Sequence, residues 1–382
     1  AAYAIISYQT AYLKTYYPKE FIAASMTMDI SNQNKLSEFY EELKRLDVDI
    51  IRPDINECFA EFKTEDDKFF YALGAIKAVG FEAISNIVNE RLINGKFKSI
   101  NDFVERINPK DINKLQLEGL VQAGTFDNLC NNRQSLHKTI PNIILKSKNI
   151  HENISINQKN LFDKEESDEI NFLENIKDWD FDIKLKKEFE TLGFYVSDHP
   201  LNQYKPIFKQ YNILSYENFE MTKEILSSNI ACTVLKIQEK KTQKGNSYAI
   251  VKFSDLNSVF ELFIFSDVFE DNREVLIEGN SLMITLIKNY TDEYKVQTRV
   301  NVKKIVSLKE IINKPIKNIT FTFKDINQLY KLKELSQIEG ETEIKLVVDN
   351  KGDILTFRLK DKRKVNHNLI NSLNLTENVI RD

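Results

Sequence analysis

Three aspartates at alternating positions, in the segment Asp178-Trp179-Asp180-Phe181-Asp182, are of a type and spacing that could do chemistry. Carboxylates held close together bind the metal ions of two-metal phosphoryl-transfer sites. A calcium loop is excluded, because Ile183 stands where that loop requires the glycine of its sharp turn. The segment ends an acidic stretch and leads directly into a lysine-rich helix, which favours a solvated helix entry. We therefore predict no catalytic residue and no metal site in the chain.

Phosphate binding is a second kind of chemistry, and the segment Ile76-Lys77-Ala78-Val79-Gly80-Phe81 indicates it. The segment resembles a helix-hairpin-helix motif, in which a tight turn between two short helices presents backbone N–H groups to a DNA phosphate. Gly80 would take a positive φ and let the backbone approach the phosphate, although Ala78 stands at the usual place of the first glycine. Gly124 marks a second, degenerate hairpin. The predicted DNA-binding residues are Lys77, Val79, Gly80 and Gly124; the alternative is that both glycines only cap structural helices.

Lysines and aromatic residues gather in a third segment. Lys240, Lys241 and Lys244 lie in a predicted loop between two strands, and Tyr248 follows it. OB-folds bind single strands with this loop, with the opposite loop (here 289–293) and with aromatic side chains of the middle strands. Alternation along the strands directs about half of the aromatic residues Tyr248, Phe253, Phe260, Phe263 and Phe265 into the core. Lys240, Lys241, Lys244 and Tyr248 are the predicted single-strand-binding residues; the alternative is a hairpin kept soluble by its lysines.

A short apolar pair stands in a strongly charged stretch. Residues 151–182 hold ten acidic residues against three lysines and contain no glycine or proline, which predicts a solvated linker. Within it, Gln158-Lys159-Asn160-Leu161-Phe162 resembles the pentapeptide with which proteins bind the bacterial sliding clamp. Leu161 and Phe162 have no core to join on a polar tether, and Gln158 could bond the rim of a pocket. Gln158, Leu161 and Phe162 are therefore the predicted clamp-binding residues.

The elements that must position these residues divide the chain of 382 residues into several domains. Apolar residues recur at helical spacing from Ala4 to about Met28 and from Asn34 to Leu46, and short helices broken by glycine fill 69–148. From 229 to 305 the order is three strands, a helix and two strands, as in an OB-fold. After Pro315 a β-α-β-β-α pattern follows. The prediction is a multidomain α + β protein with a tandem helix-hairpin-helix region, an OB-fold barrel and a small α/β C-terminal domain. The predicted regions are a helical region at 1–60, tandem hairpins at 61–150, an acidic linker at 151–182, a helical connector at 183–225, an OB-fold at 226–310 and a small α/β domain at 315–382.

Composition narrows the class of protein. Hydrophobic residues make up 42% and charged residues 29%, and the net charge is −4, so any contact with nucleic acid is expected to be local. The three cysteines form no CxxC pair and the four histidines are scattered, which argues against zinc and fits a reducing cytosol. No apolar run reaches transmembrane length, so we expect a cytoplasmic protein without a membrane partner. Because the first residue is alanine, we expect the chain to begin inside a longer protein.

Taken in order, several segments resemble the C-terminal part of the bacterial DNA polymerase III alpha subunit. They are Ala2–Lys14 with Tyr17–Phe21, Arg52–Asn56, Gly74–Lys77, Gly124–Asp127, Leu192–Tyr195 and His199–Leu201. The resemblance implies the end of a fingers region at 1–60, binding of duplex and single-stranded template DNA, an internal clamp-binding peptide and a terminal domain that docks the clamp-loader tau subunit. It also implies that the palm, with its three metal-binding aspartates, precedes Ala1. Magnesium and nucleotidyl transfer would then belong to the parent polymerase, and this chain would need no cofactor.

Two other readings share part of the pattern. A stand-alone nucleic-acid-binding protein could combine helix-hairpin-helix motifs with an OB-fold, but the fingers-like start at Ala2–Phe21 argues against it. A DNA glycosylase would need a lysine or aspartate nucleophile after the hairpin, and nothing beyond Gly80 suggests one.

Overall fold

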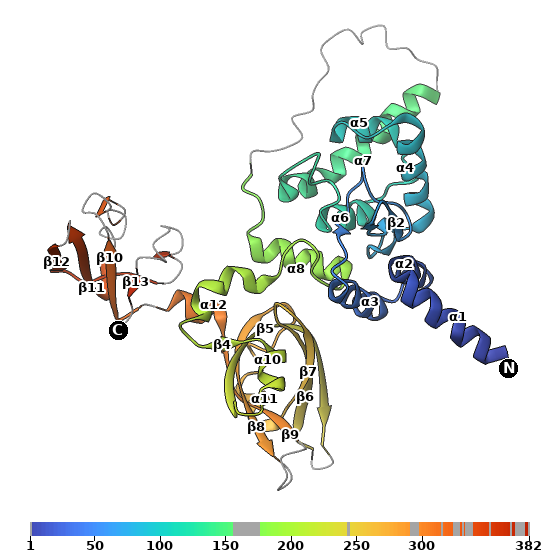
Figure 1. Ribbon diagram of the computed structural model, residues 1–382. Helices are drawn as coiled ribbons and strands as arrows, with labels where there is room; N and C mark the ends of the chain where they lie inside the picture. Colours follow the sequence, from blue (N-terminus) through green and yellow to red (C-terminus); the bar gives the residue numbers. More distant parts are fainter. Residues whose placement is uncertain are drawn as a thin grey trace. The chain divides into compact units, whose positions relative to one another are not determined.

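The computed structural model describes residues 2–155, 176–242, 245–290, 298–314, 316–323, 329–330, 332, 339–350, 353–366, 369–370 and 379–380. They form two compact units, Ala1–His199 and Pro200–Asp382 (Figure 1). The boundary falls inside the predicted connector at 183–225. The predicted clamp-binding residues Gln158, Leu161 and Phe162 lie outside the described residues, as does Lys244.

The first unit begins with three helices. They are α1 (Ala2–Tyr16), α2 (Pro18–Met28) and α3 (Gln33–Arg45). Pro18 restarts the helix because its fixed φ suits the first helical position, where no N–H is needed. Asn32 caps α3 by accepting the N–H of Lys35. The helices of the sequence prediction are therefore confirmed here.

A small sheet and a set of short helices complete the first unit. The strands are β1 (Ile50–Ile51), β2 (Lys63–Glu65) and β3 (Lys68–Phe70), in the order β1-β3-β2. The 3-10 turn η1 (Leu73–Ala75) leads to α4 (Phe81–Asn94), α5 (Ile100–Arg106), α6 (Lys114–Gln122), α7 (Arg133–Ser155) and α8 (Phe181–Leu192). Ser99 and Asn113 cap α5 and α6 with their side-chain oxygens. One continuous apolar core contains Ile22 and Leu36 of the first helices, Phe103 of α5 and Leu192 of α8.

Two boundaries of the predicted acidic linker differ from the structure. Helix α7 continues to Ser155, past the predicted start of the linker at 151. At the other end, Asp178 is not a solvated residue: it accepts the backbone N–H of Gln134 in the first turn of α7 (3.0 Å) and pairs with Lys184. Partial burial alone raises the pKa of Asp178, but the bonds from Lys184, Gln134 and Trp179 outweigh burial and leave that pKa lowered. Asp178 is thus a structural contact of α7.

The second unit contains a five-stranded sheet with a sixth strand beside it. Its elements are η2 (Pro200–Tyr204), α9 (Lys205–Phe208), β4 (Ile213–Leu214), α10 (Tyr216–Met221), β5 (Ser227–Lys241), β6 (Ser247–Ser254), β7 (Val259–Ile264), α11 (Ser266–Asp271), β8 (Ser281–Tyr290), β9 (Thr298–Ser307) and α12 (Leu308–Asn313). The strand order is β7-β6-β5-β8-β9, with β4 parallel to β5. In the described part of the sheet, no hydrogen-bonded pairing joins β7 to β9. Phe219, Phe253 and Leu286 lie in the core that the sheet encloses.

A further sheet follows in the same unit. Its strands β10 (Asn318–Phe323), β11 (Glu339–Asn350), β12 (Asp353–Arg358) and β13 (Val379–Ile380) are ordered β12-β11-β10-β13. Strand β10 runs parallel to β11, and parallel neighbours need a crossover connection between them. Most of the residues predicted as the two helices of this region lie outside the described residues. The helices and sheets together confirm a mixed α + β protein.

Candidate nucleic-acid interface

The tight turn at 76–80, between η1 and α4, has the shape of a hairpin. The N–H of Val79 donates to the carbonyl oxygen of Ile76 at 3.1 Å. Ala78 has φ +66°, whereas Gly80 has φ −76° and ψ 131° and is the N-cap of α4. The prediction that Gly80 takes the positive φ is therefore wrong. The middle residue of the turn adopts the left-handed conformation, and that residue is Ala78. Gly80 is the N-cap of α4 and needs only the extended conformation that is usual at this position.

The turn leaves backbone donors open to solvent. Lys77, Ala78 and Gly80 are exposed. The N–H of Lys77 donates to the carbonyl oxygen of Thr191 at 3.0 Å, but the N–H groups of Ala78, Gly80 and Phe81 have no hydrogen-bond acceptor among the described residues. They stand at the N-terminus of the 14-residue helix α4, where the helix dipole favours an anion. Open N–H groups at a positive helix end form an arrangement that can bind phosphate.

Gly124, the predicted second hairpin residue, has a different environment. With φ +81° it ends α6 in the left-handed conformation, and its N–H donates to Val121 while that of Thr125 donates to Leu120, both at 3.1 Å. These donors are used within the fold and are not free for a phosphate. The geometry at Gly124 supports the helix-cap alternative.

An ion network built on the buried side chains Arg133 and Glu188 lies beside Gly124, and it was not predicted from the sequence. A Cβ on Gly124 would come within 2.1 Å of Nη2 of Arg133, so only glycine leaves room for the guanidinium. Arg133 binds Asp127 through Nε (2.8 Å) and Nη2 (2.6 Å) and lies 3.8 Å from the buried Glu188 of α8. Burial alone lowers the pKa of Arg133, but the bonds to Asp127 outweigh it and raise that pKa. Arg133 is thus held as a cation that joins α7 to α8.

Glu188 also fixes the segment that follows α8. Its Oε1 accepts the backbone N–H groups of Val196 (2.7 Å) and Ser197 (2.8 Å). Phe194, in the same segment, stacks on Tyr40 of α3 with ring centroids 4.3 Å apart. The Glu188 carboxylate therefore lies beside Arg133 of α7 and also fixes the segment that follows α8.

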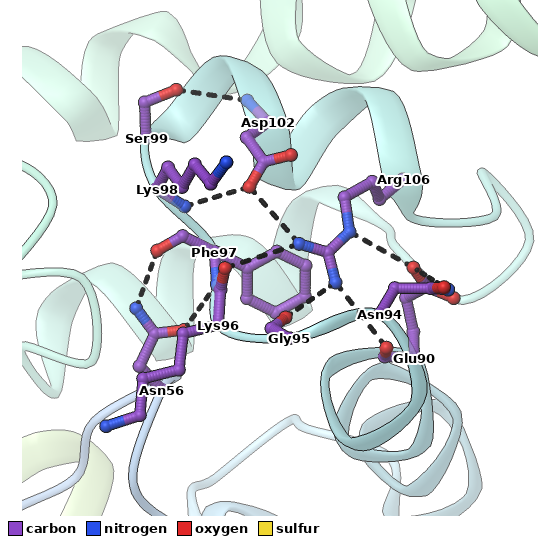
Figure 2. Close-up of polar contacts among 10 residues, drawn as sticks. All are labelled: Asn56, Glu90, Asn94, Gly95, Lys96, Phe97, Lys98, Ser99, Asp102 and Arg106. Atoms are coloured by element: carbon purple, nitrogen blue, oxygen red, sulfur yellow. Dashed lines mark hydrogen bonds and ion pairs between the residues drawn. The ribbon is translucent and has the colours of Figure 1, made fainter.

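A basic loop at 95–99, between α4 and α5, was also not predicted from the sequence. Figure 2 shows Arg106 bound to several acceptors around this loop: the carbonyl oxygens of Gly95 (2.8 Å) and Lys96 (3.4 Å), Glu90 (3.1 Å) and Asp102 (3.2 Å). Its guanidinium also lies 4.5 Å from the centre of the Phe97 ring. The loop backbone is therefore fixed from the α5 side.

Asn56 fixes the same loop from the other side. Its amide donates to the carbonyl oxygen of Phe97 and accepts the N–H of Phe97, both at 2.8 Å (Figure 2). Lys96 and Lys98 remain exposed, and Lys96 pairs with Glu57. The alternation of lysine with glycine, phenylalanine and serine in Gly95–Ser99 is the only sequence signal for this loop.

In the second unit, the sheet carries aromatic side chains on its outer face. Phe253 and Phe260 are buried, whereas Phe263 is 52% and Phe265 44% exposed, which confirms the predicted alternation. Ile250 pairs with Phe263 and Lys240 with Tyr248 across the strands, so these four residues share the outer face. We call Tyr248, Phe263, Phe265 and Arg299 the aromatic strip, because the guanidinium of Arg299 lies 4.9 Å from the centre of the Phe265 ring.

The predicted basic loop of the sheet is shorter than expected. Lys240 and Lys241 are the last residues of β5, paired with Tyr248 and Ser247, because the hairpin register continues to the end of the strand. Beyond β5, the N–H of Thr242 donates to the carbonyl oxygen of Asn246 at 2.9 Å. The opposite loop, predicted at 289–293, falls mostly on residues 291–297, which are not described.

Two further features concern the part of the chain that the structure describes. None of its helices is both long and apolar enough to cross a membrane. Within the same residues, no three His, Cys, Asp or Glu side chains gather where they could hold a metal ion.

Comparison with known proteins gives the following similarities. Residues 47–136 match the family model described as helix-hairpin-helix motif. The DNA polymerase III subunit alpha of Borreliella burgdorferi is 33% identical over 348 residues, which cover 87% of this chain and 30% of the relative. That of Caulobacter vibrioides is 33% identical over 286 residues, which cover 74% of this chain and 25% of the relative. The chain thus spans about a third or less of the length of these relatives.

One of the solved structures similar to the chain serves as an example. It is described as a replication protein A heterotrimer bound to single-stranded DNA, with a TM-score of 0.20 and 14% identity over 38% of this chain and 37% of that chain. A TM-score of this size supports no inference about the chain.

Proposed function

The chain belongs to the family of bacterial DNA polymerase III alpha subunits, and from this premise we propose that it is their C-terminal portion and holds DNA and replication partners. The observation that supports duplex binding most directly is the turn at 76–80, with the open N–H groups of Ala78, Gly80 and Phe81 at the start of α4. It lies within the residues that match the helix-hairpin-helix model. Such donors reach phosphates, which carry no base identity, so binding would be independent of sequence.

Two substitutions in the turn test duplex binding. Lys77→Ser should lower the affinity and reduce the slope of log K against log salt by about one, because one phosphate-neutralising cation is lost. Ala78→Val should lower the affinity by forcing a β-branched residue to φ +66°, while Ala78→Gly should retain it. Fluorescence anisotropy with a labelled duplex at several salt concentrations measures these effects. Wild-type affinity in both Lys77→Ser and Ala78→Val would contradict duplex binding by this turn.

For the second unit we propose an OB-fold that binds single-stranded template. In chain order, β5 to β9 are the five strands of such a barrel, and their sheet order places the first strand at the centre between the second and the fourth. Tyr248 and Phe263 of the aromatic strip lie on the second and third strands, which carry the face that OB-folds use. Lys240 and Lys252, which lie on the same outer face as Tyr248, add positive charge for the phosphates. The alternative of a stand-alone nucleic-acid-binding protein finds less support, because the relatives are similar over most of the chain.

We also propose where the activity of the parent polymerase lies and which other partners the chain binds. We assign no catalytic residue and no cofactor to this chain, and we place magnesium-dependent nucleotidyl transfer in the part of the alpha subunit outside it. The proposed partners are the sliding clamp, at Gln158, Leu161 and Phe162, and the clamp-loader tau subunit, at the region after Pro315. The resemblance of the sequence to the family supports both partners, and a cytoplasmic location follows from the same proposal.

The clamp contact can be tested with a matched pair of variants. Replacing Leu161 and Phe162 with alanine should abolish binding of the purified clamp, because these residues supply the apolar side chains of the pentapeptide. The affinity of the unsubstituted chain should be modest, on the order of micromolar, because a short peptide loses conformational entropy on binding. Phe172→Ala with Leu173→Ala changes another apolar pair of the same acidic segment and should leave binding unchanged. Calorimetry that finds equal affinities for both double variants would discard the motif.

A further inference from the structure

Helix α6 packs closely behind the turn at 76–80. Gly119, inside α6, is buried, and a Cβ at this position would lie 2.8 Å from the carbonyl oxygen of Lys77 and 3.4 Å from Cγ2 of Val79. Glycine inside a helix is less favourable than alanine, because it loses more backbone conformational freedom on folding. The close approach of the Lys77 carbonyl explains why this position is glycine.

The backbone of Lys77 is held on two sides. Its carbonyl oxygen rests on Gly119, and its N–H donates to the carbonyl oxygen of Thr191 near the end of α8. The next residue, Ala78, has φ +66°, a conformation that L-residues rarely adopt. Such a conformation persists where the surrounding structure imposes it. The contacts of Lys77 with α6 and α8 are the surroundings that impose it here.

The same helix also reaches the other end of the turn. Gln116 precedes Gly119 by three residues, so both side-chain positions face the same way from α6. Nε2 of Gln116 lies 3.2 Å from where a Cβ on Gly80 would be. The Oε1 atom of Gln116 is buried and has no hydrogen-bond partner in the described chain. The side-chain amide of Gln116 thus lies against Gly80.

We infer that Gly119 is a positioning residue for phosphate binding: it lets α6 hold the turn in the shape that exposes the N–H groups of Ala78 and Gly80. This inference rests on the proposed binding of duplex DNA by the turn. Gly119 itself touches no DNA, and its effect passes through the Lys77 carbonyl. Gln116 supports the turn at Gly80 in the same way.

The test is the substitution Gly119→Ala. The added methyl group must displace the Lys77 carbonyl, and the affinity for duplex DNA should fall about tenfold, comparable to the loss of one hydrogen bond to a charged group. The slope of log K against log salt should stay unchanged, because no cation is removed. In amide NMR spectra of the wild-type chain, the Ala78 and Gly80 signals should shift when duplex is added, and in Gly119→Ala this shift should be lost.

Lys77→Ser separates this inference from the proposed function. If Lys77→Ser reduces affinity and salt slope while a folded Gly119→Ala binds like the wild type, the positioning role is wrong and duplex binding stands. If Lys77→Ser and Ala78→Val both bind like the wild type, the proposed function itself is wrong. Should Gly119→Ala lose its thermal unfolding transition, Gln116→Ala takes its place, with an expected loss of about threefold at unchanged slope. Wild-type affinity of that variant would overturn the inference.

Discussion

Replacing Glu188 with alanine is expected to lower the free energy of unfolding of the first unit by about 3–5 kcal/mol, as for other broken buried ion pairs. The carboxylate is 1% exposed and accepts the N–H groups of Val196 and Ser197. Without it, two partly buried N–H donors lose their acceptor. Arg133 would keep Asp127 but lose the second carboxylate, 3.8 Å away. The loss should appear in urea unfolding as a lower midpoint with an unchanged slope.

Glu190→Ala is the matched control for this substitution. It removes the same side chain from the same helix, but Glu190 is exposed, so the free energy of unfolding should change by less than about 0.5 kcal/mol. Glu188→Gln, which keeps an acceptor oxygen and removes the charge, should be less destabilising than Glu188→Ala. Equal unfolding midpoints for Glu188→Ala and Glu190→Ala would show that the network does not stabilise the fold.

Replacing Phe263 and Phe265 together with alanine should weaken single-strand binding about 30-fold or more. Stacking of one base on an aromatic ring contributes roughly 1–3 kcal/mol, and two rings of the aromatic strip are removed. Both side chains are about half exposed, so the unfolding temperature should change little. Anisotropy with a labelled oligothymidine measures the affinity, and circular dichroism measures the melting temperature.

Ile277→Ala is a suitable control because it removes an apolar side chain of the same unit that is also about half exposed and is not part of the aromatic strip. Its single-strand affinity should equal that of the wild type. An unchanged affinity in the Phe263/Phe265 double variant would assign the aromatic strip to a protein partner or to a scaffold.

The strands of the second unit could be predicted closely from the sequence. Alternation in the sequence predicts strands at Ser281–Tyr290, Ser247–Asp255 and Val259–Phe265. The observed β8 has the predicted ends, and β6 and β7 are each one residue shorter than predicted. Alternation with a period of two is a strong signal where one face is buried, as the burial of Phe253 and exposure of Phe263 illustrate.

The candidate site was predicted less completely. The position of the turn at 76–80 followed from its residue types, but the assignment of the positive φ to Gly80 failed. Glycine permits a positive φ without requiring one, and the geometry of the turn placed it on Ala78. The ion pair of Arg133 with Glu188 could not be predicted, because the two residues come together only in the folded chain. No sequence periodicity relates their positions. Pairing of this kind depends on tertiary packing, which local patterns do not contain.

The apolar core shared by helices α2 and α3 and the hairpin region has a consequence for folding cooperativity. Ile22 and Leu36 belong to the same core as Phe103 and Leu192, so no boundary near residue 60 separates independent units. A chain cut there would lose apolar partners on both sides and expose surface that is now buried. The hairpin region is therefore not a portable module: residues from α2 to Phe194 should unfold in a single transition.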